Sequence, residues 1–377
     1  MSLLARELKV FAVLLYGQFP AYALPLSALG LALLWKFEKK FAALLAAIFA
    51  VSVFGMALGT NFDASNETVY FMDSFFIPAY LCAAMCACAA LAWFAGAAAR
   101  PGWKPVSWCA LALAAATPFL AFAHNYGRAD AHRNRVAADY GKCLLDGVGK
   151  DSVLFLRRDH DIMPLIYYQY VEKYRTDVKV YDDFGWVCEN VYGDGFMRLP
   201  KDAQDARRRE VQLKIAKESK NAVYFSWENK PDGADGRPDG VIFRHSEKPL
   251  KPAGECAECS LRYDYKRGIL SHDFLTRDTV SQYYYSRGEC VYASGDAGTA
   301  MRLWNMASDI AVDNAWLHNK LGVALGKKGM KNEAVRELRK AVGINPYFAV
   351  GWNNLGVAYY QSGDAKKAAE CFMKAVE

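Results

Sequence analysis

Charged side chains are scarce in the first third of this sequence. Up to about residue 123 the chain is rich in Ala, Leu and Phe, while the remainder is polar and charged; the overall values of 53% hydrophobic and 23% charged residues hide this contrast. The chain also lacks a dense run of Lys and Arg with interleaved aromatic residues, and its net charge of +6 is modest. Nucleic acid is therefore not expected as a partner.

Four segments lack charge over a length that can cross a bilayer, which takes about 20 residues. They are Val10–Trp35, Phe41–Gly59, Ser74–Ala99 and Pro105–Ala123. Only a helix satisfies its own backbone in hydrocarbon, so we expect an α-helical membrane bundle over residues 1–123 with about four spans, at 18–35, 41–59, 74–98 and 105–123.

The first apolar segment contains Pro20 and Pro25, which divide it into two parts. Residues 2–17 are expected to form an interfacial helix ahead of the span. A cleaved signal peptide is the alternative, because Arg6 and Lys9 precede the apolar run and "AYA" follows at 21–23. The run continues to Trp35, which favours the span.

Charges in the short loops predict the orientation of the bundle. The loops "KFEKK" (36–40) and "RPGWK" (100–104) are basic, whereas the loop between them carries Asp63, Glu67 and Asp73 and no Lys or Arg. The basic loops should be cytoplasmic, and the polar half should face the periplasm or a lumen. Three arginines argue against this orientation, because they follow the last span on the predicted exterior side: Arg128, Arg133 and Arg135.

A second pair of metal ligands is missing around the C-x-x-C motif of Cys256 and Cys259, so a zinc site is not expected. The alternatives are a local disulfide in an exterior compartment and a pair without function. No other cofactor is predicted.

The residues from 124 to 270 are expected to form a small α/β domain. Apolar or alternating runs predict strands at 152–156, 177–182, 221–227 and 241–245, with helices at 161–174 and 201–219. Asp161 is expected to cap the first of these helices, with Pro164 in its first turn. The stretch "KPDGADGRPDG" (230–240) is expected to be a turn.

Acidic residues follow the first two predicted strands. Asp159, His160 and Asp161 come after the first, and Asp182 and Asp183 after the second. Ligands bind outside the carboxyl ends of strands in open sheets, so these five residues are a candidate site for a divalent metal ion or a sugar. The simpler alternative is that the acids near 159–161 stabilise the start of the helix.

The last hundred residues repeat with a period of 34. Leu321 and Gly322 recur as Leu355 and Gly356, and an earlier unit keeps the register except that Arg287 replaces the expected Leu. The pattern resembles the tetratricopeptide repeat, a helix–turn–helix unit that stacks into an all-α solenoid and binds protein partners. Over residues 271–377 we expect units starting at about 281, 315 and 349, with this framework: Leu321, Gly322, Ala334, Pro346, Trp352, Leu355, Gly356, Tyr359, Ala368 and Phe372.

A wider resemblance rests on three phrases in a fixed order. They are "QFPAYALPLSALGLALLW" (18–35), "ETVYFMDSFFIPAYLCAA" (67–84) and "DSVLFLRRDHDIMPLIYYQYVEKYRTDVKVYD" (151–182). Together they resemble the rear half of protein O-mannosyltransferase-like members of the GT-C glycosyltransferases, which often carry C-terminal tetratricopeptide repeats. In that family a "GDND"-like turn is expected where this chain has "RRDHD".

This resemblance implies a membrane enzyme that uses a polyprenyl-phosphate sugar for protein O-glycosylation. It supplies no catalytic residue, because the acidic first loop of GT-C enzymes is expected upstream of this chain. Glu377 falls inside the third repeat unit, so more chain is also expected beyond it. The function expected is a C-terminal portion of such a transferase, with repeats that recognise a protein partner or acceptor. The alternative is a non-catalytic, membrane-anchored repeat scaffold.

Overall fold

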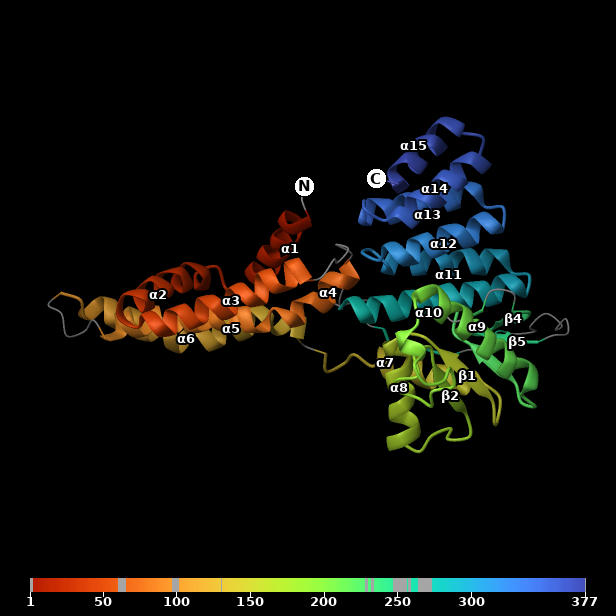
Figure 1. The fold of residues 1–377 in the computed structure, drawn as a ribbon, viewed down its shortest axis with the longest axis horizontal. Helices are drawn as coiled ribbons and strands as arrows, with labels where there is room; N and C mark the ends of the chain where they lie inside the picture. The colour runs from red at the N-terminus through yellow and green to blue at the C-terminus, as the bar shows by residue number, and fades with distance from the viewer. Residues whose placement is uncertain are drawn as a thin grey trace. The chain divides into compact units, whose positions relative to one another are not determined.

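The computed structural model describes residues 3–59, 66–96, 102–129, 131–227, 230–231, 234–246, 256, 259–263 and 273–376. The chain divides into two compact units, one formed by residues 1–131 with 342–348 and the other by residues 132–341 with 349–377. We describe each unit by itself (Figure 1). Asp63 lies outside the described residues.

The first unit is a bundle of helices. Its six helices are α1 (Leu3–Gln18), α2 (Ala23–Phe37), α3 (Lys39–Gly59), α4 (Asn66–Phe75), α5 (Ile77–Gly96) and α6 (Lys104–Ala129). Small residues allow α2 and α5 to approach closely: a Cβ at Gly30 would lie 1.6 Å from the carbonyl oxygen of Cys86. Ser27 adds a hydrogen bond of 2.7 Å to the carbonyl of Ala83. Small residues and hydroxyl groups at a helix contact are typical of packing inside a bilayer.

Three of these helices are long and apolar enough to cross a membrane: Lys39–Leu58 in α3, Ile77–Gly96 in α5 and Lys104–Gly127 in α6. The chain bends by 104° between Glu7–Gln18 and Ala23–Phe37, at the place where the sequence predicts that an interfacial helix ends and the span at 18–35 begins. The bend falls at Pro20, which cannot donate the backbone hydrogen bond that a continuous helix needs. Counting the bent pair as one span gives four.

The predicted span at 74–98 begins later than expected. Residue 76 is a turn that separates α4 from α5, so Asp73 ends up in the last turn of α4. Its carboxylate accepts hydrogen bonds from Gln18 at 2.9 Å and Tyr80 at 2.6 Å. Asp73 thereby joins the end of α1 to the start of α5.

The second unit begins with a mixed five-stranded sheet. Helix α7 (Val136–Asp146) precedes β1 (Val153–Leu156), β2 (Lys179–Asp182), β3 (Val223–Phe225), β4 (Gly236–Asp239) and β5 (Ile242–His245). The strand order is β2-β1-β3-β5-β4; β1 is parallel to β2 and β3, and the other two pairings are antiparallel. Strand β4 was missed in the predicted turn at 230–240, because "GRPD" has no β-forming residue.

Helices cover both faces of this sheet. Leu154 and Leu156 pack with residues of α7 and α8 (Asp159–Ile166), whereas Val153 and Phe155 pack on the opposite side with residues of α9 (Lys201–Glu218). All four residues of β1 are buried. A strand covered on both faces reads as a continuous apolar run, as "SVLFL" does.

The prediction for the helix at 161–174 is wrong at both ends. Helix α8 begins at Asp159 after Arg158, so Asp161 is not its cap and Pro164 lies inside the helix rather than in its first turn. A π-helix follows at Tyr167–Val171 and ends the segment. Proline removes one backbone donor, and a wider π-type turn is one way for a helix to adjust to such an interruption.

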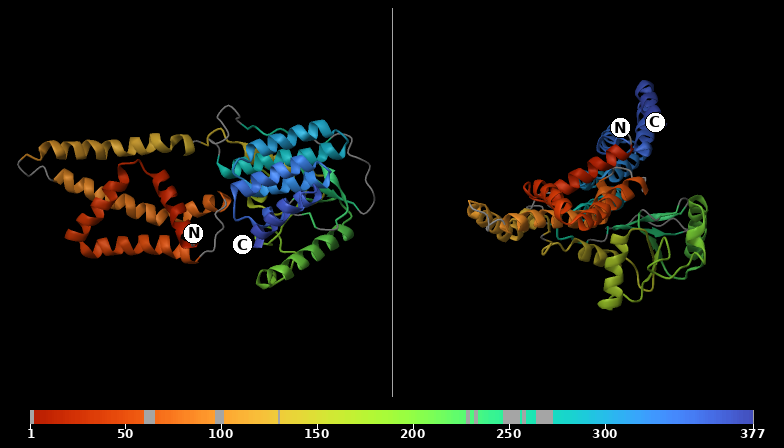
Figure 2. Two further views of the ribbon diagram at one scale, coloured as in Figure 1. Left: turned by 90° about the horizontal axis from the view of Figure 1, so that it is seen from above. Right: turned by 60° about the vertical axis from the view of Figure 1, so that its left-hand side comes forward.

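The helices that follow the sheet in the described part of the chain run in antiparallel pairs (Figure 2). They are α10 (Phe274–Ala293), α11 (Ala297–Ile310), α12 (Ala315–Lys327), α13 (Lys331–Ile344), α14 (Ala349–Gln361) and α15 (Ala365–Val376). The predicted repeat units at 315 and 349 coincide with the starts of α12 and α14. The first unit differs, because α10 begins at Phe274, seven residues before the predicted start.

Glycine at one repeat position explains how each pair packs. A Cβ at Gly288 would lie 2.4 Å from Trp304, at Gly322 2.6 Å from Leu338, and at Gly356 2.5 Å from Phe372. Each of these glycines lies on the first helix of a pair and its contact on the second. The absence of a side chain lets a large residue from the second helix pack directly on the backbone of the first.

The remaining framework residues occupy the places that the repeat predicts. Leu321, Leu355, Ala334 and Ala368 are buried between the helices of their pairs. Pro346 lies in the turn between α13 and α14. Trp352 and Tyr359 are half-buried on α14, and Phe372 is partly exposed on α15. The predicted repeat fold is therefore confirmed.

Candidate functional site

Helix α10 is shared by the sheet domain and the repeats. Twelve of its twenty residues are buried, against four of thirteen in α14. One side of α10 packs on α11 and α12, and the other contacts α7 and β4. The sheet domain thus covers the outer side of the first repeat, as a terminal capping repeat does in a solenoid.

The predicted site after β1 faces this shared helix. Arg158 holds Asp161 through two hydrogen bonds of 2.9 and 3.1 Å, and donates a third, of 2.8 Å, to Asp278 on α10. Nε2 of His160 lies 3.0 Å from the same Asp278 carboxylate. Asp159 is exposed in the first turn of α8.

Asp278 connects the two domains through its charge. Its other carboxylate oxygen accepts a hydrogen bond of 2.6 Å from Asn314, which caps α12. Burial opposes ionisation of Asp278, but the positive charges of Arg158, His160 and Lys320 together hold its pKa below the ordinary value. The carboxylate is therefore charged at neutral pH and bridges β1, α10 and α12.

The predicted site after β2 is built differently. The carboxylate of Asp182 accepts four backbone N–H groups, from Phe184, Trp186, Val187 and Cys188, at 2.8 to 3.1 Å. Burial acts against ionisation, yet these four donors lower its pKa. Asp182 therefore shapes the loop at 184–188.

Asp183 turns toward α9. It accepts a hydrogen bond of 3.1 Å from Gln212 and lies 3.5 Å from Arg208 and 3.6 Å from Arg157. Burial raises the pKa of Asp183 to about 6 despite the two arginines. Arg157 follows β1 and Asp183 follows β2. Their contact shows that the carboxyl ends of these two parallel strands lie at the same edge of the sheet, as expected.

The five predicted residues do not converge on one ligand. Asp161 and His160 point to Arg158 and α10, while Asp182 and Asp183 point into the following loop and α9. Among the described residues, no group of three or more His, Cys, Asp or Glu side chains could hold a metal ion. Their role in ligand binding stays a prediction.

Two disulfides join Cys256 and Cys259, in the segment that connects β5 to α10, to the sheet domain and the repeats. Cys259 pairs with Cys143 on α7, and Cys256 pairs with Cys290 on α10. The expected local disulfide between Cys256 and Cys259 is therefore wrong, because each of the two cysteines pairs with another one. The sequence analysis missed the two partner cysteines. Cys143 lies 116 residues from Cys259, and Cys290 lies 34 residues from Cys256.

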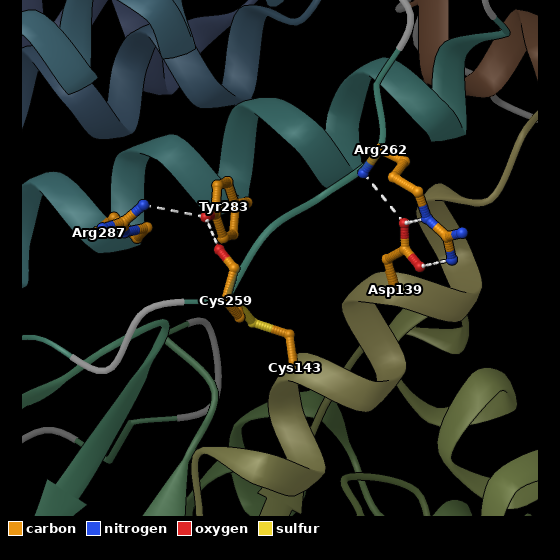
Figure 3. Close-up of a disulfide and its surroundings, with 6 residues drawn as sticks. All are labelled: Asp139, Cys143, Cys259, Arg262, Tyr283 and Arg287. Carbon is orange, nitrogen blue, oxygen red and sulfur yellow. Dashed lines mark hydrogen bonds and ion pairs between the residues drawn. A yellow bond between two sulfur atoms is a disulfide. The ribbon is translucent and has the colours of Figure 1, made fainter.

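Side chains next to the first disulfide reinforce the same connection (Figure 3). Arg262 donates to the Asp139 carboxylate of α7, with its side chain at 2.5 and 2.9 Å and its backbone N–H at 3.0 Å. Tyr283 of α10 donates to the carbonyl of Cys259 and accepts 3.1 Å from Arg287. The exceptional arginine of the first repeat thus serves the junction with the connecting segment.

The later repeats present an exposed apolar stripe. Trp316 and Val350 occupy the second position of their units and are 50% and 47% exposed. Val357 is 40% exposed at the ninth position, where Val323 of the preceding unit is half-buried. Positions seven apart lie on one face of a helix, so the four side chains follow one face of α12 and α14. We call these four residues the repeat stripe.

Polar residues stabilise the helices that carry the repeat stripe. Asn354 of α14 donates 2.9 Å to Asn319 of α12, and Lys320 of α12 donates 3.2 Å to Gln282 of α10. These bonds connect successive first helices of the repeats. The stripe is therefore displayed by helices that are fixed to each other.

Comparisons with known proteins agree with this architecture. Residues 137–230 match the family described as TMEM260-associated domain 2, and residues 317–348 and 349–377 match two families of tetratricopeptide repeat. Human Tetratricopeptide repeat protein 7A is 29% identical over 93 residues, which cover 25% of this chain and 11% of that protein. Uncharacterized protein MJ0572 of Methanocaldococcus jannaschii is 32% identical over 66 residues, 18% of this chain and 77% of that protein.

The fold and the comparisons agree on tetratricopeptide repeats at the end of this chain, a class of repeat that generally binds protein partners. The chain carries tetratricopeptide repeats over residues 317–377. It spans about a tenth of the length of the human relative.

Proposed function

We propose that this protein is a membrane-anchored adaptor that binds a protein partner on the repeat stripe. The observation that carries the proposal is that apolar side chains occupy the same two positions of consecutive repeats, exposed at the second position in both and at the ninth in Val357. Aromatic and aliphatic anchors of this kind contribute much of the binding energy in protein interfaces. The helices α2, α3, α5 and α6 would hold the stripe near a membrane.

A photo-crosslinking amino acid at Val357, in the full chain in its native membrane, tests this proposal. We expect a discrete crosslinked protein that disappears when Trp316 is replaced by Ala. The matched control places the crosslinker at Glu370, an exposed residue of α15. Equal crosslinking at both positions, or crosslinking that persists without Trp316, would count against the stripe.

The second candidate is a part in a GT-C-like, polyprenyl-phosphate-sugar-dependent protein O-glycosyltransferase. The phrases at 18–35 and 67–84 favour it, and the structure adds that Gln18, Asp73 and Tyr80 from these phrases are joined by hydrogen bonds. In this case the repeats would hold the acceptor protein.

Sugar transfer distinguishes the two candidates. The protein expressed from its complete gene would be purified in detergent and incubated with polyprenyl-phosphate mannose and the partner captured at Val357. Transfer of mannose to that partner supports the transferase. Capture of the partner without transfer supports the adaptor.

The location that we propose is an integral membrane protein with its second unit in the periplasm or a lumen. Disulfides form and persist in oxidising compartments and are rare in the cytosol. The pairs Cys143–Cys259 and Cys256–Cys290 thus favour the same side as the loop charges.

A further inference from the structure

Strand β2 forms one edge of the sheet. The order β2-β1-β3-β5-β4 gives it a single neighbour among the strands that the structure describes. Lys179 donates 2.9 Å to the carbonyl of Ser152, and Asp183 donates 3.1 Å to that of Leu156, so these backbone groups face β1. Backbone groups alternate in direction along a strand. The N–H and C=O of Val180 therefore face the opposite, outer edge.

A groove follows this outer edge. It has a volume of about 390 Å³ and is lined by Val178 and the β2 residues Lys179, Val180 and Tyr181, by Cys188 and Glu189, and by residues from the end of α8 and the π-helix. Strand β2 and two segments separate from it in the sequence therefore line the groove, and Gln169 of the π-helix donates 2.8 Å to the carbonyl of Val178 at the start of this edge. None of the five residues predicted as a ligand site lines it.

The segments that line the groove carry unusual backbone and exposed rings. Gln169 and Tyr170 belong to the π-helix, a conformation that is frequent at functional sites. Lys173, which also lines the groove, has a φ of 52°, in the left-handed region that side chains other than glycine rarely adopt. Tyr170 is 68% exposed, and Trp186, two residues before Cys188, is 71% exposed.

We propose that this groove binds an extended acidic peptide segment, which adds to β2 as a further strand. An open strand edge recognises an extended chain through its backbone, and side-chain pockets beside it select the sequence. Two lysines and one glutamate line the groove, so its positive charge favours acidic side chains: Lys173, Lys179 and Glu189. This surface lies on the sheet domain and is separate from the repeat stripe.

The competing explanation is that Lys179 protects the edge. Short edge strands with lysine discourage pairing with other chains. Protection predicts that no peptide pairs with β2, whereas our proposal predicts selective pairing with acidic peptides.

The test uses the full chain in detergent micelles and two fluorescent peptides, one alternating threonine with glutamate and one alternating threonine with lysine. We expect the glutamate peptide to bind, by fluorescence anisotropy, and the lysine peptide to bind less tightly. The double variant Lys173→Glu, Lys179→Glu should weaken the affinity for the glutamate peptide by about fivefold, which corresponds to the loss of two surface ion pairs. The matched control is Lys201→Glu, Lys220→Glu, at exposed positions outside the groove.

Hydrogen exchange locates the bound peptide. We expect the glutamate peptide to protect the amide of Val180. Failure of both peptides to bind overturns the proposal and supports edge protection. Binding that leaves Val180 unprotected, or that the control variant weakens equally, also overturns it. Protection of Val180 at high protein concentration without peptide would assign the edge to a second copy of this chain instead.

Discussion

Arg158, at the carboxyl end of β1, donates a hydrogen bond of 2.8 Å to Asp278 on α10, which lies 120 residues further along the chain. The same carboxylate holds Asn314 at the start of α12. A motif that reads as a ligand site in the sequence therefore joins the sheet domain to the repeats. This junction explains why α10 is longer than the first helices of the other two repeats.

Replacement of Asp278 by Ala should destabilise the second unit by about 2 kcal/mol, because a buried charged hydrogen bond is lost and Arg158 is left without that partner. Denaturant unfolding of the full chain, followed by tryptophan fluorescence, measures the change. Arg158→Ala combined with Asp278→Ala should cost less than the sum of the two single variants. Strict additivity would show that the two residues do not act together.

Asp159 is the matched control at the same motif. Its side chain is exposed in the first turn of α8, so Asp159→Asn should cost no more than about 0.3–1 kcal/mol through the helix dipole. Calorimetry with Mg²⁺ should show the same heats before and after the substitution. A binding heat that this substitution abolishes would restore the metal-site interpretation of residues 159–161.

The contact between Gly356 and Phe372 predicts a cost for any side chain at this position. Gly356→Val would force Phe372 away from the backbone of α14 and should destabilise the last repeat by about 1–3 kcal/mol. Circular dichroism melting of the full chain measures it. Gly343→Ala on α13 is the control, since nothing lies within 4 Å of the added carbon. Equal effects of both substitutions would contradict the packing.

A buried acid in the repeats predicts a dependence of stability on pH. Glu337 accepts hydrogen bonds of 2.8 Å from Ser308 and makes an ion pair of 2.8 Å with His318. Burial opposes its charge, but the hydrogen bonds from His318 and Ser308 outweigh burial and lower its pKa to about 2.

Because the pKa of Glu337 is depressed by folding, its contribution is present above the ordinary value of 4.5 and is lost as the pH falls from there toward 2. The full loss is on the order of 3 kcal/mol below both pKa values, and about 2 kcal/mol of it should have occurred at about pH 3. Denaturant unfolding at about pH 6 and about pH 3 measures it, and Glu337→Gln should flatten the difference. Glu370→Gln, exposed on α15, should leave it unchanged. An unaltered pH dependence in Glu337→Gln would refute this account.

The parts of the fold that follow from periodicity could be predicted from the sequence. Gly322 and Gly356 recur because each pair of helices must approach closely at the same point. The strands β1 and β2 could be found because their apolar residues are continuous or alternate. The apolar helices could be found because charge is absent from them over sufficient length.

The remaining features depend on contacts between distant residues. The partner of Arg158 lies on a helix whose sequence carries no sign of the sheet domain, and the partners of Cys256 and Cys259 are single cysteines in unrelated segments. Pro20 indicated that the helix would be interrupted after Gln18, but the sequence did not predict the angle of the bend. Strand β4 forms from "GRPD" because its backbone pairs with that of β5. The β-propensity of the four residues alone does not predict this pairing.

We propose that the second unit lies outside the cytosol, where disulfides of Cys256 and Cys259 join the sheet domain to the repeats. Mass spectrometry of the unreduced full chain, purified from its membrane with free thiols blocked, tests this claim most directly. The account predicts cross-linked peptides that join Cys143 to Cys259 and Cys256 to Cys290, with Cys188 blocked as a free thiol. A Cys256–Cys259 bond, or four blocked thiols at these positions, would contradict it.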